Sequence, residues 1–454
     1  MSEPRNQLRK SFTLFGLTMI AVSASFGSGI FFSVSQTAQQ VPVASWIIAV
    51  WIAGGIITLT GALSFAELGA MFPGTGGVYI YLRKAYGDLI AFLYGWASLT
   101  IITSGAIAGL AIAFVNNIDF FFGFSDTDKL LLGVATIIIL TAINIFNSKV
   151  SEAVAGGGTL LKIVGVLIII IIGLFFSEQS EALVQYSFES SVGWEDFGMA
   201  MVGAMWAYGG WHYTATLAGE TENPAQKIPR AMLIGSVIIT LIYVAVNWSY
   251  LQVLSPNELA MSESPATEIV SRVIPNGSAL MAGLIALSVF VTASIYTATA
   301  PRIYFRMAED GLFFPWLAKV HPQFRVPLRA IVIQGAWAIV LLVGWREFAD
   351  VITYVTVADW VFLLLAGIAV FIFRVRKQTT ELEALDSPLK DERPHAGFKI
   401  PLYPVTPIIY VLMVLFFIAA VMIAEPKNAM AFAAVIASGL LANVLFRKWR
   451  MRQD

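Results

Sequence analysis

The sequence predicts an all-α polytopic membrane protein with about twelve spanning helices. Of its 454 residues 58% are hydrophobic and only 13% are charged, and the mean hydropathy is +0.77. Soluble domains carry about 25% charged residues, so this chain has too little polar surface for a water-exposed fold. Stretches nearly free of charge, such as 160–176 and 408–424, approach the roughly 20 residues that cross a hydrocarbon core.

Hydrophobic runs place the spans along the chain. We expect helices at 13–36, 45–68, 88–115, 130–146, 157–176, 197–220, 231–253, 278–305, 328–344, 350–374, 403–423 and 428–446. The longest connections, 251–277 and 375–401, are too short and too polar for a separate soluble domain. Residues 1–454 are therefore expected to form one transmembrane domain.

Basic residues are distributed unevenly over the connections. If the N-terminus is cytoplasmic, 23 of the 28 Lys and Arg residues lie in cytoplasmic segments, four lie outside and Lys162 is within a span. Cytoplasmic loops of membrane proteins are enriched in Lys and Arg. The distribution predicts an even number of spans in the plasma (inner) membrane, with both termini in the cytoplasm.

Several classes of function are disfavoured by composition. The chain has no cysteine, which excludes disulfides and thiolate metal sites. Its net charge of −1 gives no basic footprint for nucleic acid. The three histidines are scattered, and no nucleophile–base or H-E-x-x-H pattern occurs. We expect no enzyme, no metal and no cofactor.

Glycine interrupts two of the spans. Ser25-Phe26-Gly27-Ser28-Gly29 lies midway through the first span, and 207–211 (AYGGW) lies midway through the sixth. Each glycine costs about 1 kcal/mol relative to alanine within a helix. Unwound backbone in a membrane is tolerated only where it is enclosed by protein or lines a cavity. The alternative is that the small residues are close-packing contacts between helices, as in small-xxx-small motifs.

The five-span separation of the two interruptions favours a binding site. If 13–176 and 197–374 are inverted five-helix repeats, followed by two additional helices at 403–446, both breaks meet near the bilayer midplane. A half-helix beginning near Gly29 presents free N–H groups that suit a carboxylate. A half-helix ending near Trp206 presents carbonyls that suit an ammonium group. The pair predicts recognition of a zwitterionic amino acid.

An ordered set of motifs resembles the amino acid–polyamine–organocation superfamily. The motifs are 26–31 (FGSGIF), 64–69 (SFAELG), 73–79 (PGTGGVY), 206–211 (WAYGGW), 219–224 (GETENP) with 228–230 (IPR), and 301–305 (PRIYF) with 310–312 (DGL) and 321–322 (HP). The sixth-span motif is most similar to the L-type amino acid transporter branch. This resemblance implies a LeuT-like fold of 5+5 inverted repeats, alternating access, and sodium-independent exchange of neutral L-amino acids.

The resemblance also implies site residues. Substrate would be bound by Ser25, Phe26, Gly27, Ser28 and Gly29 on the carboxylate side, by the carbonyls of Trp206, Ala207 and Gly209 on the ammonium side, and by Tyr213 and Ser294 in the side-chain pocket. Trp206 would also be the aromatic gate. His212 replaces a common Asn, and Trp206 is bulkier than the usual Phe, so the side-chain specificity departs from the family pattern.

Animal relatives are joined to a single-span heavy subunit through a disulfide. A chain without cysteine cannot form that link, so a free-standing, prokaryotic protein is expected.

Charged residues within spans are candidates for function. Lys162 either snorkels to the interface or, as the resemblance implies, braces the first helix where sodium-coupled relatives bind a cation. Asp359 either makes a hydrogen bond within the bundle or acts in transport. Glu67 and Glu220, at helix ends, are expected to pair with arginines.

Three other functions remain alternatives. One is proton-coupled uptake with Lys162 as the coupling group, and the second is an amino-acid sensor on the same fold. A channel is disfavoured because no ring of charges or repeated filter sequence is present.

Overall fold

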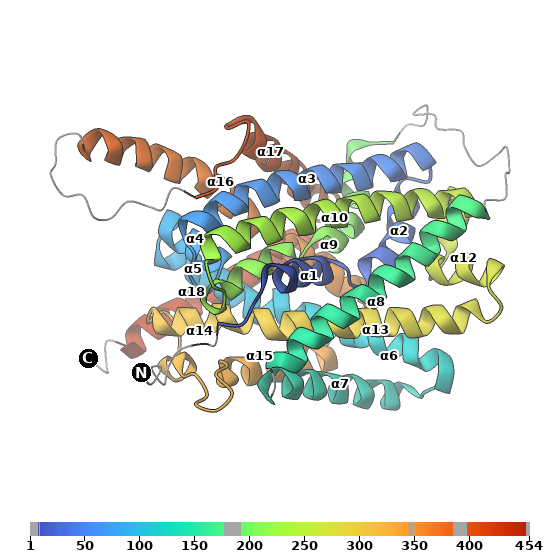
Figure 1. Ribbon diagram of the computed structural model, residues 1–454, viewed down its shortest axis with the longest axis horizontal. Helices are drawn as coiled ribbons and strands as arrows, with labels where there is room; N and C mark the ends of the chain where they lie inside the picture. The colour runs from blue at the N-terminus through green and yellow to red at the C-terminus, as the bar shows by residue number, and fades with distance from the viewer. Residues whose placement is uncertain are drawn as a thin grey trace.

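The structure is a computed structural model that describes residues 8, 10–146, 148–176, 192–344, 348–384 and 397–450. Within these residues the chain is a bundle of helices that run mostly along one common direction (Figure 1). An isolated bridge between Phe12 and Thr221 is the only strand-like pairing in this described part. The prediction of an all-α fold is confirmed.

The helices follow the hydrophobic runs of the sequence. In chain order they are α1 (Leu14–Ser25), α2 (Gly29–Gln40), α3 (Ala44–Met71), α4 (Val78–Tyr86), α5 (Asp88–Ala97), the π-helix η1 (Ser98–Ile102), α6 (Thr103–Phe122), α7 (Asp126–Phe146), α8 (Ser148–Phe175), α9 (Trp194–Tyr208), the 3-10 helix η2 (Trp211–Glu220), α10 (Pro224–Val253), α11 (Pro256–Met261), α12 (Pro265–Val273), α13 (Gly277–Thr299), α14 (Pro301–Glu309), the 3-10 helix η3 (Pro315–Ala318), α15 (Leu328–Gly344), α16 (Phe348–Ala384), α17 (Val405–Ala424) and α18 (Pro426–Arg450).

The helices account for the twelve expected spans. Among the described residues, ten segments are long and apolar enough to cross a membrane. The ninth span, α15, is a shorter apolar helix, and the sixth consists of α9 and η2. The chain is a multi-pass membrane protein.

Several helices run past the bounds of the expected spans. The tenth span, expected at 350–374, agrees to within three residues with the apolar segment Thr353–Arg376, but its helix α16 continues to Ala384. Hydrophobicity marks where a helix leaves the bilayer, but Arg, Lys and Gln, which follow at 374–378, are good helix formers in water. Residues 385–396, the rest of the connection expected at 375–401, lie outside the described part of the chain.

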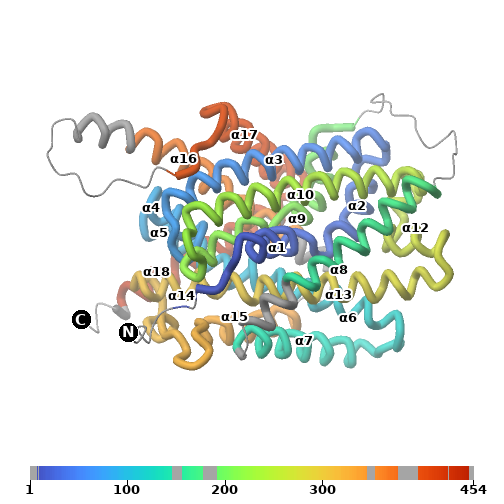
Figure 2. Tube along the Cα trace, in the orientation of Figure 1, coloured from blue at the N-terminus to red at the C-terminus, as the bar shows by residue number. Residues whose placement is uncertain are grey.

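The short helix α1 lies in the interior of the bundle. It packs against α8, α10, α13 and η2, and it lies beside α8 and α10 near the middle of the bundle (Figures 1 and 2). Ten of its twelve residues are buried. The helices α17 and α18 pack on other faces, against α3, α9 and α16 and against α5 and α16 respectively. The two breaks predicted from glycine are therefore enclosed by protein, as exposed backbone polar groups in a membrane require.

The third span contains a short π-helix, η1, that the sequence did not indicate. Here the Thr103 hydroxyl donates to the Ser98 carbonyl at 2.7 Å and lies 2.6 Å from the Tyr304 hydroxyl. Single π-helical turns within α-helices are frequent at functional sites. In this chain the π-turn precedes Ala106, and Ile102 within it and Ala106 both line the cavity described below.

Two buried carboxylates pair with arginine, as predicted. Glu220, at the end of η2, lies 2.8 Å from Arg302 at the start of α14, and both side chains are almost wholly buried. The Glu67 carboxylate accepts from Arg374 Nη2 and from the Ile400 N–H, each at 2.7 Å. Buried charges need partners of this kind because desolvation is costly. These pairs join the motif regions around 64–69 and 219–224 to later helices.

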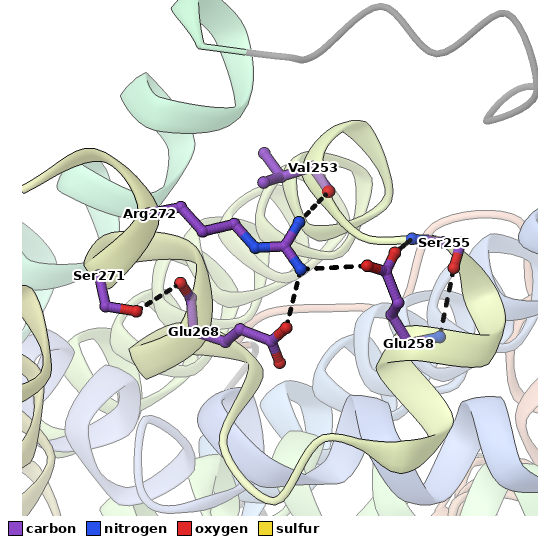
Figure 3. A network of polar contacts seen from close by, with 6 residues as sticks. All are labelled: Val253, Ser255, Glu258, Glu268, Ser271 and Arg272. Carbon is purple, nitrogen blue, oxygen red and sulfur yellow. Dashed lines mark hydrogen bonds and ion pairs between the residues drawn. The ribbon is translucent and has the colours of Figure 1, made fainter.

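At the other end of the bundle, the connection between α10 and α13 is folded into α11 and α12 (Figure 3). Arg272 donates to Glu258 at 3.1 Å, to Glu268 at 2.9 Å and to the Val253 carbonyl at 3.1 Å. The N–H and hydroxyl of Ser255, and then Arg272, lower the pKa of Glu258. The carboxylate therefore stays charged, and able to hold Arg272, at neutral pH.

This outer connection is attached to α2. The Ser35 hydroxyl donates to the Ser262 carbonyl at 2.8 Å, and Gln39 Nε2 donates to the Ala260 carbonyl at 2.9 Å. The arginine network fixes α11 and α12 to each other, and these two bonds fix α11 to the second half of the first span.

Candidate functional site

The first span is broken where the glycine motif predicted. Helix α1 ends at Ser25, Phe26 leaves helical geometry with φ −81° and ψ 60°, and α2 begins at Gly29. The first N–H groups of a helix have no partner within it, and the helix dipole gives them partial positive charge. The break therefore places the N-terminus of α2 in the interior of the bundle.

The second break is equally local. Helix α9 ends at Tyr208, Gly209 is extended, and Gly210 has a φ of +103°, which favours glycine. A side chain at 210 would also meet the Ala24 carbonyl group at 2.7 Å. The Gly-Gly pair is thus required both for the turn and for its close approach to α1.

The two breaks lie against each other. A Cβ atom added at Gly29 would lie 2.6 Å from the Ala207 Cα, so α2 and α9 touch through backbone. The buried Tyr243 hydroxyl, from α10, lies 2.6 Å from the Ser25 carbonyl and 3.0 Å from the Ala207 carbonyl, and can donate to either. One side chain thereby joins the carboxyl ends of α1 and α9. The geometry brings together one helix N-terminus and two helix C-termini.

Lys162 is buried against the carboxyl end of α1. Its Nζ donates to the Phe26 carbonyl and the Ser23 hydroxyl at 2.9 Å each, to the Ser23 carbonyl at 3.4 Å and to the Thr292 hydroxyl at 2.6 Å. Only 2% of its surface is exposed. These contacts exclude the snorkelling alternative, because the ammonium group is directed into the bundle and not to the interface.

Trp206, the residue expected to act as the gate, lies against the break in the first span. The Trp206 indole N–H donates to the Ser28 hydroxyl at 3.1 Å, which links the end of α9 to the residue before α2. The Trp206 carbonyl accepts the Gly209 N–H at 3.2 Å. The Phe26 ring is buried against Tyr243, with 5.7 Å between centroids. Gly27 leaves room for Thr292, because an added Cβ would lie 3.2 Å from its methyl group.

A small cavity lies beside the second break. Its lining residues are Ile102, Ala106, Met205, Trp206, Gly209, Tyr213, Tyr296, Val355, Thr356, Asp359 and Trp360. The volume open to the centre of a water molecule is about 20 Å³, and one water needs about 10–15 Å³. A whole amino acid does not fit in this space.

Of the two residues that the sequence assigned to a side-chain pocket, Tyr213 lines this cavity and Ser294 does not. The Ser294 hydroxyl instead accepts a hydrogen bond from Asn144 Nδ2 at 3.2 Å, toward α7. Asp359, left open by the sequence, is part of the lining, and its Oδ2 lies 3.8 Å from Nε2 of the buried His212. Within the described residues, no group of three His, Asp or Glu is arranged to hold a metal ion.

Comparison with known proteins identifies the family of the chain. The family model described as amino acid permease matches residues 12–443, nearly the whole chain. The chain belongs to the amino acid permease family. Similar proteins include the serine/threonine exchanger SteT of Bacillus subtilis, 30% identical over 93% of each chain. The b(0,+)-type amino acid transporter 1 of Mus musculus is 30% identical, over 97% of this chain and 88% of its own.

These relatives place the permease in the L-type branch of the amino acid–polyamine–organocation superfamily, so the predicted resemblance and the LeuT-like fold are confirmed. A more distant relative is the human cystine/glutamate transporter, 26% identical over 98% of this chain and 86% of its own.

Sequence reasoning missed three residues that hold the break of this permease. Tyr243 bridges the two carboxyl ends, and Ser288 and Thr292 on α13 lie 3.2 Å from the Phe26 carbonyl. Ser288 and Thr292 are four residues apart and so share one helix face. That spacing was a usable signal, whereas a single tyrosine in an apolar span was not distinctive.

Proposed function

We propose that this permease exchanges neutral L-amino acids across the plasma membrane, by alternating access and without sodium. The observation that carries the proposal is the meeting of the two breaks, where the N-terminus of α2 and the carboxyl end of α9 touch at Gly29 and Ala207. One end suits a carboxylate and the other an ammonium group. An amino acid carries both.

Each of the two breaks would bind one charged group of the zwitterion. Backbone N–H groups in the segment Ser25 to Gly29 would receive the carboxylate, and carbonyls of Trp206, Ala207 and Gly209 the ammonium. Because the Trp206 and Ala207 carbonyls already accept hydrogen bonds, their second lone pairs would bind the substrate. The side chain would extend toward Tyr213.

Lys162 supports independence from sodium. Its ammonium group lies among four oxygen acceptors at the carboxyl end of α1, a position that would otherwise suit a bound cation. Because the ammonium group of Lys162 supplies a positive charge at this position, the protein would need no sodium ion there. Without a coupling ion, one amino acid can be accumulated only against the movement of another, and the relative SteT is named a serine/threonine exchanger.

Alternating access would use the 5+5 arrangement. We assign 13–176 and 197–374 to the two inverted repeats and 403–446 to the additional helices, with both termini in the cytoplasm. The ends of α4, α14 and α18, where many of the predicted cytoplasmic arginines and lysines occur, lie at one end of the bundle, opposite α12 (Figure 1). The chain would act without a disulfide-linked heavy subunit, because it has no cysteine.

The test is uptake of labelled L-serine by proteoliposomes in sodium-free buffer, with vesicles either empty or preloaded with unlabelled L-serine. We expect uptake into preloaded vesicles to exceed uptake into empty ones at least tenfold. A tenfold ratio corresponds to a free-energy difference of about 1.4 kcal/mol. Equal uptake into both would contradict exchange. Accumulation in empty vesicles driven by an imposed pH gradient would favour proton-coupled uptake instead.

A further inference from the structure

The cavity beside the second break has a mixed lining. Most of its wall is apolar or aromatic, with Trp206, Tyr296 and Trp360 the largest side chains. Four side chains with hydroxyl or carboxyl groups interrupt that wall: Tyr213 from η2, Tyr296 from α13, and Thr356 and Asp359 from α16. Of these, Tyr213, Thr356 and Asp359 are nearly inaccessible, with 1%, 2% and 8% of their surfaces exposed.

One oxygen atom of each of Tyr213, Thr356 and Asp359 is unpartnered in the described part of the chain. The Tyr213 hydroxyl, the Thr356 hydroxyl and Asp359 Oδ1 make no hydrogen bond in the described part of the chain. Many other buried hydroxyls of this permease bond to a carbonyl of their own helix, as Thr297 does to Ala293, although some outside the cavity, such as those of Thr58 and Ser104, also lack a partner in the described residues. Buried polar groups in native proteins are normally paired. Three unpaired oxygens around one cavity therefore indicate a missing polar occupant.

His212 does not supply the missing partner. Its Nε2 lies 3.8 Å from Asp359 Oδ2, beyond hydrogen-bond distance, and neither ring nitrogen makes a hydrogen bond within the described residues. Two buried cations of the described chain are engaged elsewhere: Lys162 at the carboxyl end of α1 and Arg302 with Glu220. Asp359 thus remains available to a group that enters the cavity.

We propose that Asp359, Thr356 and Tyr213 bind a hydroxyl group on the substrate side chain, so that the preferred substrates are small hydroxy amino acids. This inference rests on the proposed exchange function and narrows its substrate class. A hydroxyl both donates and accepts, so it matches a carboxyl group in either protonation state and the two neighbouring hydroxyls. It is also close to a water molecule in size, and the cavity has room for about one water.

The size of the cavity argues against longer polar substrates. A Lys or Arg side chain would need to displace Trp206, Tyr296 or Trp360 before its charged end reached Asp359. A side chain of the same shape without the hydroxyl would fit but leave the three oxygens unpaired. Sites that bind a substrate hydroxyl discriminate strongly against analogues that lack it, whereas apolar pockets discriminate weakly.

The test compares isosteric competitors in the exchange assay. Labelled L-serine uptake into serine-loaded proteoliposomes is inhibited with unlabelled L-threonine or L-valine, which have the same shape. Wild type is expected to bind threonine at least tenfold more tightly than valine. Asp359→Leu is expected to abolish or invert this ratio. Thr356→Val, which replaces a hydroxyl by a methyl group of similar size, is expected to reduce the threonine/valine affinity ratio several-fold. This variant provides the test if Asp359→Leu does not fold.

Thr136→Val is the matched control, because Thr136 is a buried threonine that bonds to Leu132 on its own helix and does not line the cavity. Its threonine/valine ratio should equal that of wild type. Equal inhibition by threonine and valine in wild type would overturn the inference while leaving amino-acid exchange standing. An unchanged ratio in both Asp359→Leu and Thr356→Val would overturn it as well. Failure of wild type to exchange any amino acid would overturn the proposed function itself.

Discussion

Replacing Lys162 by alanine is expected to reduce exchange at least tenfold. The substitution removes an ammonium group that donates to Ser23, Phe26 and Thr292 in a buried site. Hydrogen bonds that involve a charged group contribute about 1.5–3 kcal/mol each, and unpaired buried acceptors add a cost. The carboxyl end of α1 should therefore lose its fixed position beside the substrate. Initial rates of L-serine counterflow in proteoliposomes measure the effect.

Lys399→Ala is the control, because it removes the same charge from an exposed position. It should exchange like wild type. Both variants should elute as single symmetric peaks in detergent, and the Lys162 variant should melt at a lower temperature. Wild-type counterflow by a folded Lys162→Ala variant would refute the bracing role and with it the explanation for sodium independence.

Replacing Gly29 by alanine is expected to abolish most transport. The added Cβ would lie 2.6 Å from both Cα and Cβ of Ala207 and 3.1 Å from its backbone nitrogen, so α2 and α9 would have to separate. Such overpacking typically costs about 1–3 kcal/mol, and here it displaces the two helix ends that are proposed to bind substrate. We expect at least a tenfold loss in counterflow, with a lower melting temperature.

Gly283→Ala is the matched control, since it lies within α13 with no atom within 4 Å of its added Cβ. A glycine-to-alanine change in an unobstructed helix should leave the protein equally or slightly more stable, by up to about 1 kcal/mol. Its transport should be unaffected. A Gly29→Ala variant that retained full transport would mean that the contact between α2 and α9 is only packing.

The fold could be predicted because the bilayer leaves few choices. Long apolar runs of this length form spanning helices, and unwound backbone within them is tolerated only where protein encloses it or a cavity adjoins it. The breaks at Gly27–Gly29 and Gly209–Gly210, and the pairing of Glu67 and Glu220 with arginines, followed from these constraints. The end of α16 did not, because nothing in the bilayer argument terminates a helix in water.

The site could be predicted only where the backbone carries it. Motifs located the helix ends, but the side chains that hold them come from other spans, 36 to 269 residues away in the bonds of Tyr243 and Thr292. The spacing of Ser288 and Thr292 indicates that they share a helix face, but it does not indicate which backbone that face meets. For the same reason Asp359 was left between two roles.

Recognition of a zwitterion by two helix ends is the central claim, and substrate analogues test it most directly. Labelled L-serine counterflow is measured against excess L-threonine, against its amine analogue that lacks the carboxylate, and against its carboxylic acid analogue that lacks the ammonium group. The account predicts that only L-threonine inhibits, because each analogue leaves one helix end unpaired. Equal inhibition by either analogue would contradict it, since one of the two helix ends would then have no part in binding.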